Sequence, residues 1–140
     1  MTCTIDALAT STGGATARQT TIVTSNTSKM LHIYFKIILG TSPTSNRGLY
    51  FWLIKADTQG SPFRFDGAGS SDAALTRVGM PPIKIWPNKT SGAATGDTLT
   101  GGFEIYDPGP SWGLAVGHDT GVNLGTGCSL WYIGEQDLYA

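Results

Sequence analysis

The sequence predicts an all-β protein, a single-domain β-sandwich spanning residues 1–140, with about eight or nine strands and a jelly roll as the favoured version. Short segments rich in β-branched and aromatic residues recur along the chain, and polar turn residues separate them. The 19 glycines and seven prolines argue against long helices. A chain of 140 residues also has the size of one ordinary domain.

Two segments give the clearest strand signals. Residues 31–39, LHIYFKIIL, end at a glycine, and residues 49–56, LYFWLIKA, follow a polar loop, so together they predict a β-hairpin. Weaker strand signals lie in CTIDAL (3–8), RQTTIVTS (18–25), PFRFD (62–66), IKIW (83–86), TLTGGFEIY (98–106), WGLAVGHD (112–119) and SLWYIGEQ (129–136). The one helix candidate is SSDAALT (70–76), in which a serine or Asp72 would cap a single turn.

Both faces of the two strongest strands are apolar. Successive side chains of a strand point to opposite faces. In residues 49–54 the odd-numbered residues form one face and the even-numbered residues form the other, and both sets are apolar. A sandwich strand in a lone monomer has one face in water. The second face must therefore be covered by a loop, by the chain's own N-terminal segment or by another subunit. Our hypothesis is a subunit interface formed by Tyr34, Tyr50, Trp52 and Ile54.

The segment WGLAVGHD places a histidine beside a carboxylate, but strand parity separates them. His118 shares a face with Trp112 and the apolar residues between them, and Asp119 lies on the other face. A catalytic histidine must reach its orienting carboxylate within hydrogen-bond distance, which neighbours on a regular strand cannot do. We therefore expect His118 to close an apolar stripe, and Asp119 and Thr120 to form a turn into Gly121.

Motifs for metals, phosphates and nucleophilic catalysis are absent from the sequence. The two histidines, His32 and His118, are too far apart for a zinc motif, DGAGSSD (66–72) lacks the ligands of an EF-hand, and SGAATGD (91–97) lacks the lysine of a phosphate loop. The sequence also contains no Gly-x-Ser-x-Gly. We expect no cofactor, no metal and no enzymatic activity.

Two sets of residues leave alternatives open. Glu104 and Glu135, each on a predicted strand, are the first pair to test for glycosidase chemistry, although two surface carboxylates are the simpler interpretation. Exposed aromatic residues would stack on sugar rings in a carbohydrate-binding module, whereas buried ones anchor a core or an interface. The four tryptophans are Trp52, Trp86, Trp112 and Trp131.

Charge and cysteine usage restrict the partners. Nine Lys and Arg against ten Asp and Glu give a net charge of -1 without a run of one sign, so we expect binding to neither nucleic acid nor an anionic membrane. The start of the chain, MTCTIDALATSTGG, has neither a basic region nor a continuous apolar stretch, which predicts synthesis in a reducing cytoplasm. Cys3 and Cys128 are then expected to be buried thiols.

Several stretches together resemble small all-β virion structural proteins of tailed bacteriophages. They are ARQTTIVTS from Ala17, the two strong strands, DGAGSSDAAL from Asp66 and PGPSWGLAVGHDTGVNL from Pro108. The resemblance implies a head decoration or cement protein, made in the host cytoplasm and located on the capsid surface of the virion. It also implies the major capsid protein as partner and a homo-oligomer, with a trimer favoured. The alternatives are a neck, tail or fibre adaptor and a carbohydrate-binding β-sandwich module.

Overall fold

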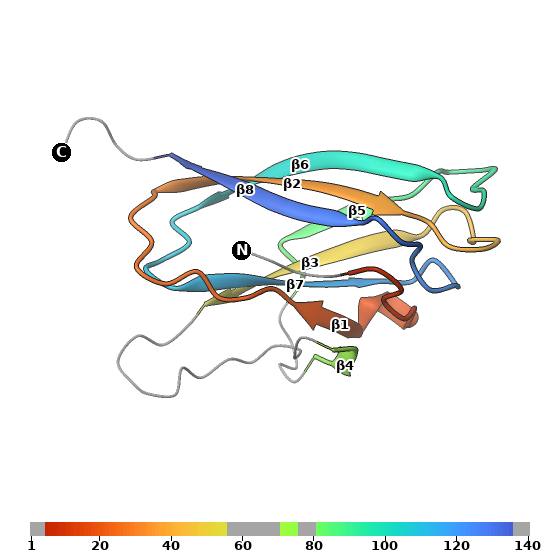
Figure 1. The fold of residues 1–140 in the computed structure, drawn as a ribbon, viewed down its shortest axis with the longest axis horizontal. Helices are drawn as coiled ribbons and strands as arrows, with labels where there is room; N and C mark the ends of the chain where they lie inside the picture. Colours follow the sequence, from red (N-terminus) through yellow and green to blue (C-terminus); the bar gives the residue numbers. More distant parts are fainter. Residues whose placement is uncertain (1–4, 56–70, 76–80, 136–140) are drawn as a thin grey trace.

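The computed structural model describes residues 5–55, 71–75 and 81–135. These residues form two antiparallel sheets that face each other (Figure 1). One sheet has the strand order β4-β1-β7-β3-β5 and the other has the order β6-β2-β8. The elements are a 3-10 helix η1 (Thr12–Gly14) and the strands β1 (Thr16–Gln19), β2 (Met30–Ile38), β3 (Gly48–Lys55), β4 (Ala73–Ala74), β5 (Lys84–Pro87), β6 (Thr98–Tyr106), β7 (Trp112–His118) and β8 (Ser129–Glu135). The predicted all-β sandwich is confirmed.

The core lies between the two sheets and follows from strand parity. Alternate residues of β2 are buried in the core, and the residues of β3 that face the other sheet are buried or half-buried. Phe35 of β2 contacts Phe51 of β3 across the core, with ring centroids 5.2 Å apart, and packs edge-on against Trp86 of β5 at 5.1 Å. All side chains of β7 are buried, so this strand forms the centre of the five-stranded sheet.

The predicted hairpin of residues 31–39 and 49–56 is wrong. β2 pairs with β6 and β8, whereas β3 pairs with β5 and β7 in the opposite sheet. The loop between β2 and β3 therefore connects one sheet to the other. The two strands bury their apolar faces against each other instead of pairing edge to edge. The chain changes sheet repeatedly, but the sheets hold five and three strands, and the jelly-roll version of the sandwich stays a prediction.

The predicted helix over residues 70–76 is also wrong, because its described part contains β4. Ala73 pairs with Ala17 and adds the segment to the open edge of β1. Asp72 does not cap a helix. Its carboxylate accepts hydrogen bonds from Arg18 Nε and, at 2.9 Å, from the backbone N–H of Ala9, so it joins three separate segments.

Two weaker strand predictions are wrong in part, and a third is not tested. The described part of CTIDAL, residues 5–8, forms a turn that buries Ile5 and Leu8 in the core. β1 ends at Gln19, and only an isolated bridge between Val23 and Trp112 continues it. The predicted strand PFRFD lies outside the described residues.

The part of the outer face of the five-stranded sheet that β1, β3 and β7 form is covered by the chain itself. Trp52 and Ile54 are only 6% and 3% exposed, and Ala73 and Leu75 pack against them. A side chain at Gly117 of β7 would collide with the backbone of η1, so η1 lies directly on this face. Tyr50, Trp52 and Ile54 therefore do not form the exposed subunit interface that the sequence predicts, because the chain's own segments provide the cover.

Candidate binding face

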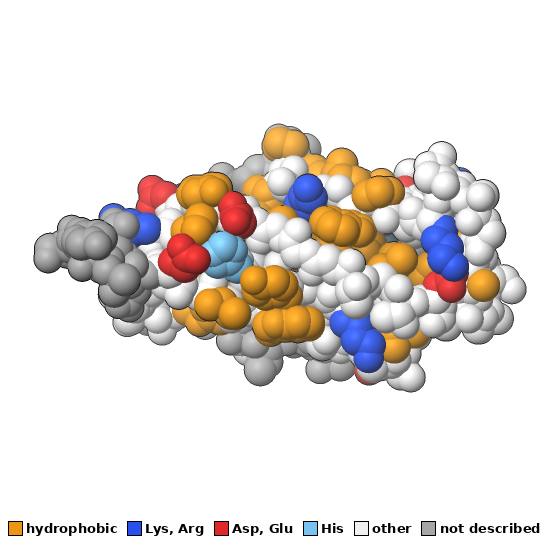
Figure 2. All heavy atoms as spheres, turned by 90° about the horizontal axis from the view of Figure 1, so that it is seen from above, with side chains coloured by type: hydrophobic (Ala, Val, Ile, Leu, Met, Phe, Trp, Pro, Cys, Tyr) orange, Lys and Arg blue, Asp and Glu red, His pale blue; other side chains and the backbone are white. Residues whose placement is uncertain are grey.

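The outer face of the three-stranded sheet is the exposed counterpart of this covered surface. On the strands β6 and β8, Tyr106, Trp131 and Ile133 are 69%, 46% and 56% exposed. Figure 2 shows this side of the molecule, where hydrophobic side chains gather around acidic ones and a histidine. We call this surface the binding face and define it by His32, Tyr34, Glu104, Tyr106, Trp131, Ile133 and Glu135.

Strand register brings the aromatic residues together. Tyr34 of β2 lies between Gly102 of β6 and Trp131 of β8. The Tyr34 and Trp131 rings stack, with centroids 5.8 Å apart and planes 20° apart. A Cβ atom at Gly102 would lie 3.1 Å from the Tyr34 ring and 2.7 Å from the carbonyl oxygen of Ile33. The glycine thus leaves the space that the tyrosine ring needs against the sheet.

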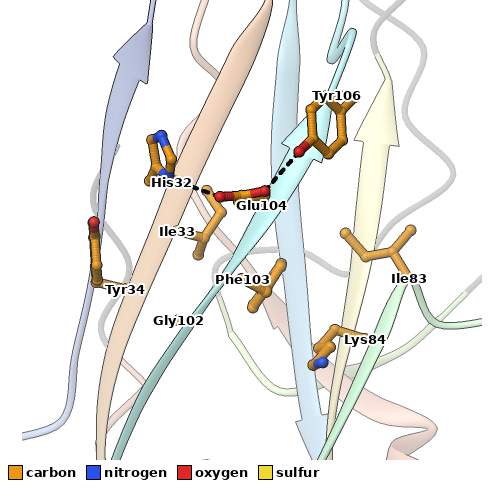
Figure 3. Close-up of a pocket in the computed structure, with 9 residues that line it drawn as sticks. All are labelled: His32, Ile33, Tyr34, Ile83, Lys84, Gly102, Phe103, Glu104 and Tyr106. Carbon is orange, nitrogen blue, oxygen red and sulfur yellow. Dashed lines mark hydrogen bonds and ion pairs between the residues drawn. The ribbon is translucent and has the colours of Figure 1, made fainter.

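The same register places one histidine between two carboxylates. His32 Nε2 lies 2.7 Å from Glu135 Oε1 on β8, and Nδ1 lies 3.5 Å from Glu104 Oε1 on β6. The Tyr106 hydroxyl donates to Glu104 Oε2 at 2.7 Å, and this hydrogen bond raises the pKa of Tyr106. Figure 3 shows His32 and Tyr106 approaching Glu104 from opposite sides. Glu104 is therefore held in place while it stays exposed to solvent.

An open groove of about 730 Å³ runs beside this cluster, between β6 and β5 (Figure 3). A site of this volume accepts a side chain or a small ligand. Lys84 supplies the one lysine or arginine among the described lining residues, and its Nζ lies 5.5 Å from the centroid of the Trp86 ring. The lining residues are His32, Ile33, Tyr34, Ile83, Lys84, Gly102, Phe103, Glu104 and Tyr106.

The structure brings some predicted site residues together and separates others. Glu104 and Glu135 share His32, as part of one exposed surface cluster. Tyr34 lies on the binding face, whereas Tyr50 belongs to the opposite sheet, together with Trp52 and Ile54. The four residues of the predicted interface therefore do not form one surface.

His118 and Asp119 point apart, as strand parity predicts. His118 is fully buried, its Nε2–H donates to the Leu8 carbonyl at 2.8 Å, and its Nδ1 lies 2.9 Å from the Thr120 hydroxyl. Burial lowers the pKa of His118. Asp119 instead accepts hydrogen bonds from the Gly48 N–H at 2.7 Å and from the Tyr50 hydroxyl at 3.0 Å. Each residue thus fixes a separate part of the fold.

Sequence reasoning named Trp131 only as one of four tryptophans that could stack on sugars, and it missed Tyr106 and Ile133. A usable signal exists in the segment LWYI, because Leu130 and Tyr132 lie on one face of β8 while Trp131 and Ile133 lie on the other. Both faces of β8 are thus apolar, by the same parity rule that singled out β3.

Other kinds of site find little support in the described ranges. Within residues 5–55, 71–75 and 81–135, no group of three or more His, Cys, Asp or Glu residues is arranged to hold a metal ion. The same ranges contain no helix long and apolar enough to cross a membrane. Burial raises the pKa of the Cys128 thiol, whose sulfur lies 3.3 Å from the backbone nitrogen of Ile38.

Fold and site together define a β-sandwich with one sheet covered by its own chain and one sheet carrying an exposed aromatic and acidic face. Comparisons with protein-family models, with curated proteins and with solved structures gave no match.

Proposed function

We propose that this protein is a structural, non-enzymatic component of a tailed-phage virion, a decoration or cement subunit that binds the major capsid protein. The exposed aromatic and aliphatic side chains of the binding face carry this proposal. Contiguous apolar surface on a soluble domain typically marks an interaction site. The resemblance of the sequence to phage virion proteins indicates which kind of partner covers it.

The energetics suit a subunit that stabilises an assembled lattice. Covering about 300 Å² of apolar surface contributes at most about 7 kcal/mol at roughly 25 cal/mol per Å². A protein that binds only the assembled lattice stabilises it by mass action. The net charge of -1 adds little repulsion between neighbouring copies. We propose a trimer around a local symmetry axis, because closed symmetry uses the same contact in every copy.

Quantitative mass spectrometry of purified particles tests the proposal. A decoration subunit is expected at a copy number comparable to that of the major capsid protein. A copy number of only a few per particle would favour the alternative, an adaptor in the neck, tail or fibre. Absence of the protein from purified particles would exclude both virion roles.

A carbohydrate-binding module is the second candidate, because Trp131 and Tyr106 expose aromatic rings beside the carboxylates of Glu104 and Glu135. Sugar rings stack on such aromatic residues, and carboxylates accept hydrogen bonds from sugar hydroxyls. A glycan array tests this candidate directly. Binding that is lost in Trp131→Ala would support it, and signals at background for all glycans would remove it.

A further inference from the structure

We propose that the binding face receives the guanidinium group of an arginine from the partner, held between the Glu104 and Glu135 carboxylates and the neighbouring aromatic rings. The inference deepens the proposed function, because it names the chemistry that the capsid partner must present to this face. It is carried by the charge balance, the apolar surroundings and the groove.

The charge balance of the cluster is negative in either protonation state of His32. A neutral imidazole has one N–H and donates to one carboxylate only, which leaves two negative charges. A protonated imidazole balances one of the two carboxylate charges and leaves one negative charge. In the described ranges, no lysine or arginine nitrogen lies within 4.0 Å of Glu104 or Glu135. Among the described residues, the cluster therefore has an unbalanced negative charge.

Because the surroundings of this charge are apolar, covering it with a partner costs free energy. A partner that lies on Tyr106, Trp131 and Ile133 also removes water from the carboxylates between them. Desolvating an unpaired carboxylate costs several kcal/mol, so an apolar partner surface alone would bind poorly. A partner that fits this face must therefore bring a positive charge to the carboxylates.

Arginine fits the arrangement better than lysine. Its planar guanidinium group pairs with carboxylates through two parallel hydrogen bonds and also stacks on aromatic rings. The Tyr106 ring lies beside Glu104, to which its hydroxyl is hydrogen-bonded, and the stacked Tyr34 and Trp131 rings lie on the same face of the sheet. Figure 3 shows Glu104 facing the groove at one end, with Lys84 farther along it. Because Lys84 repels a second cation, the arginine is expected at the end of the groove where His32 connects Glu104 to Glu135.

An NMR titration of the full chain with a small probe tests the inference without particles. The probe is N-acetyl-arginine amide, and its matched neutral control is N-acetyl-citrulline amide, which has nearly the same shape. We expect the arginine probe to shift the Trp131 indole N–H signal, and the citrulline probe to leave it nearly unchanged. Glu104→Gln is expected to reduce the initial slope of this shift about threefold, the effect of one exposed charge pair.

Asp97→Asn is the matched control variant. It removes one carboxylate just before β6, at roughly 20 Å along the chain direction from Glu104, where Asp97 pairs with Lys89. It should leave the titration unchanged. Equal shifts with both probes, no shift with either, or equal slopes in wild type and Glu104→Gln would overturn the inference. A positive titration with a protein that is absent from particles would instead refute the capsid role and retain the arginine site.

Discussion

Two tryptophans on opposite sheets should respond very differently to truncation. Trp52 is buried in a single chain, stacks on Tyr50 with centroids 5.9 Å apart and packs near Ile54. Trp52→Ala is therefore expected to lower the free energy of unfolding by about 3–5 kcal/mol, as for other buried tryptophans. Trp131 is 46% exposed. Trp131→Ala should cost only about 0.5–1.5 kcal/mol, mainly through the lost stack on Tyr34.

Urea unfolding of wild type and both variants, followed by far-UV circular dichroism, measures this difference. Each transition should be recorded at two protein concentrations ten times apart. The free-energy cost of Trp52→Ala relative to wild type should be the same at both concentrations, because the chain itself covers Trp52. A Trp131→Ala variant as unstable as Trp52→Ala would refute the assignment of the two faces. A Trp52→Ala variant of nearly wild-type stability would contradict the burial of Trp52, and a cost of Trp52→Ala that changes with concentration would show that another subunit covers it.

Three further predictions concern the interior. Burial lowers the folded-state pKa of His118, so below about pH 6.5 the folded protein binds fewer protons than the unfolded chain. The free energy of unfolding should therefore fall on acidification from about pH 7.5 to about pH 5.5. Urea midpoints should show a smaller fall in His118→Gln than in wild type. Gly117→Ala forces a methyl group into the backbone of η1 and should cost about 1–3 kcal/mol in the same assay, and an unchanged midpoint would contradict the close packing of η1 on β7. Because burial raises the pKa of the Cys128 thiol, a Cys3→Ser variant should react slowly with Ellman's reagent when folded and rapidly in urea; equal rates would refute burial.

The sequence predicted the strands better than their partners. Parity correctly grouped the alternate residues of β3 into two apolar faces and separated His118 from Asp119. The hairpin failed because a loop such as residues 40–47 looks the same whether it reverses within one sheet or crosses to the other. Two strands with strong apolar faces bury more surface by facing each other across the core, and this preference is not visible in either strand alone.

The binding face was only partly predictable. Parity applied to LWYI would have shown that Trp131 and Ile133 point away from the core. Glu104 and Glu135 were recognised as a pair worth testing, but no pattern in the sequence connects them with His32. That connection depends on the order β6-β2-β8, in which a strand early in the chain lies between two late ones. Such long-range sheet order does not follow from local patterns.

We propose that the exposed face of the three-stranded sheet is the surface that binds the virion. Saturation binding of the labelled protein to purified particles that lack it tests this claim most directly. We predict that Trp131→Ala weakens binding strongly, while Ile85→Ala, a similarly exposed residue on the other sheet, leaves it unchanged. Equal binding of wild type and both variants, or loss of binding only in Ile85→Ala, would contradict the claim.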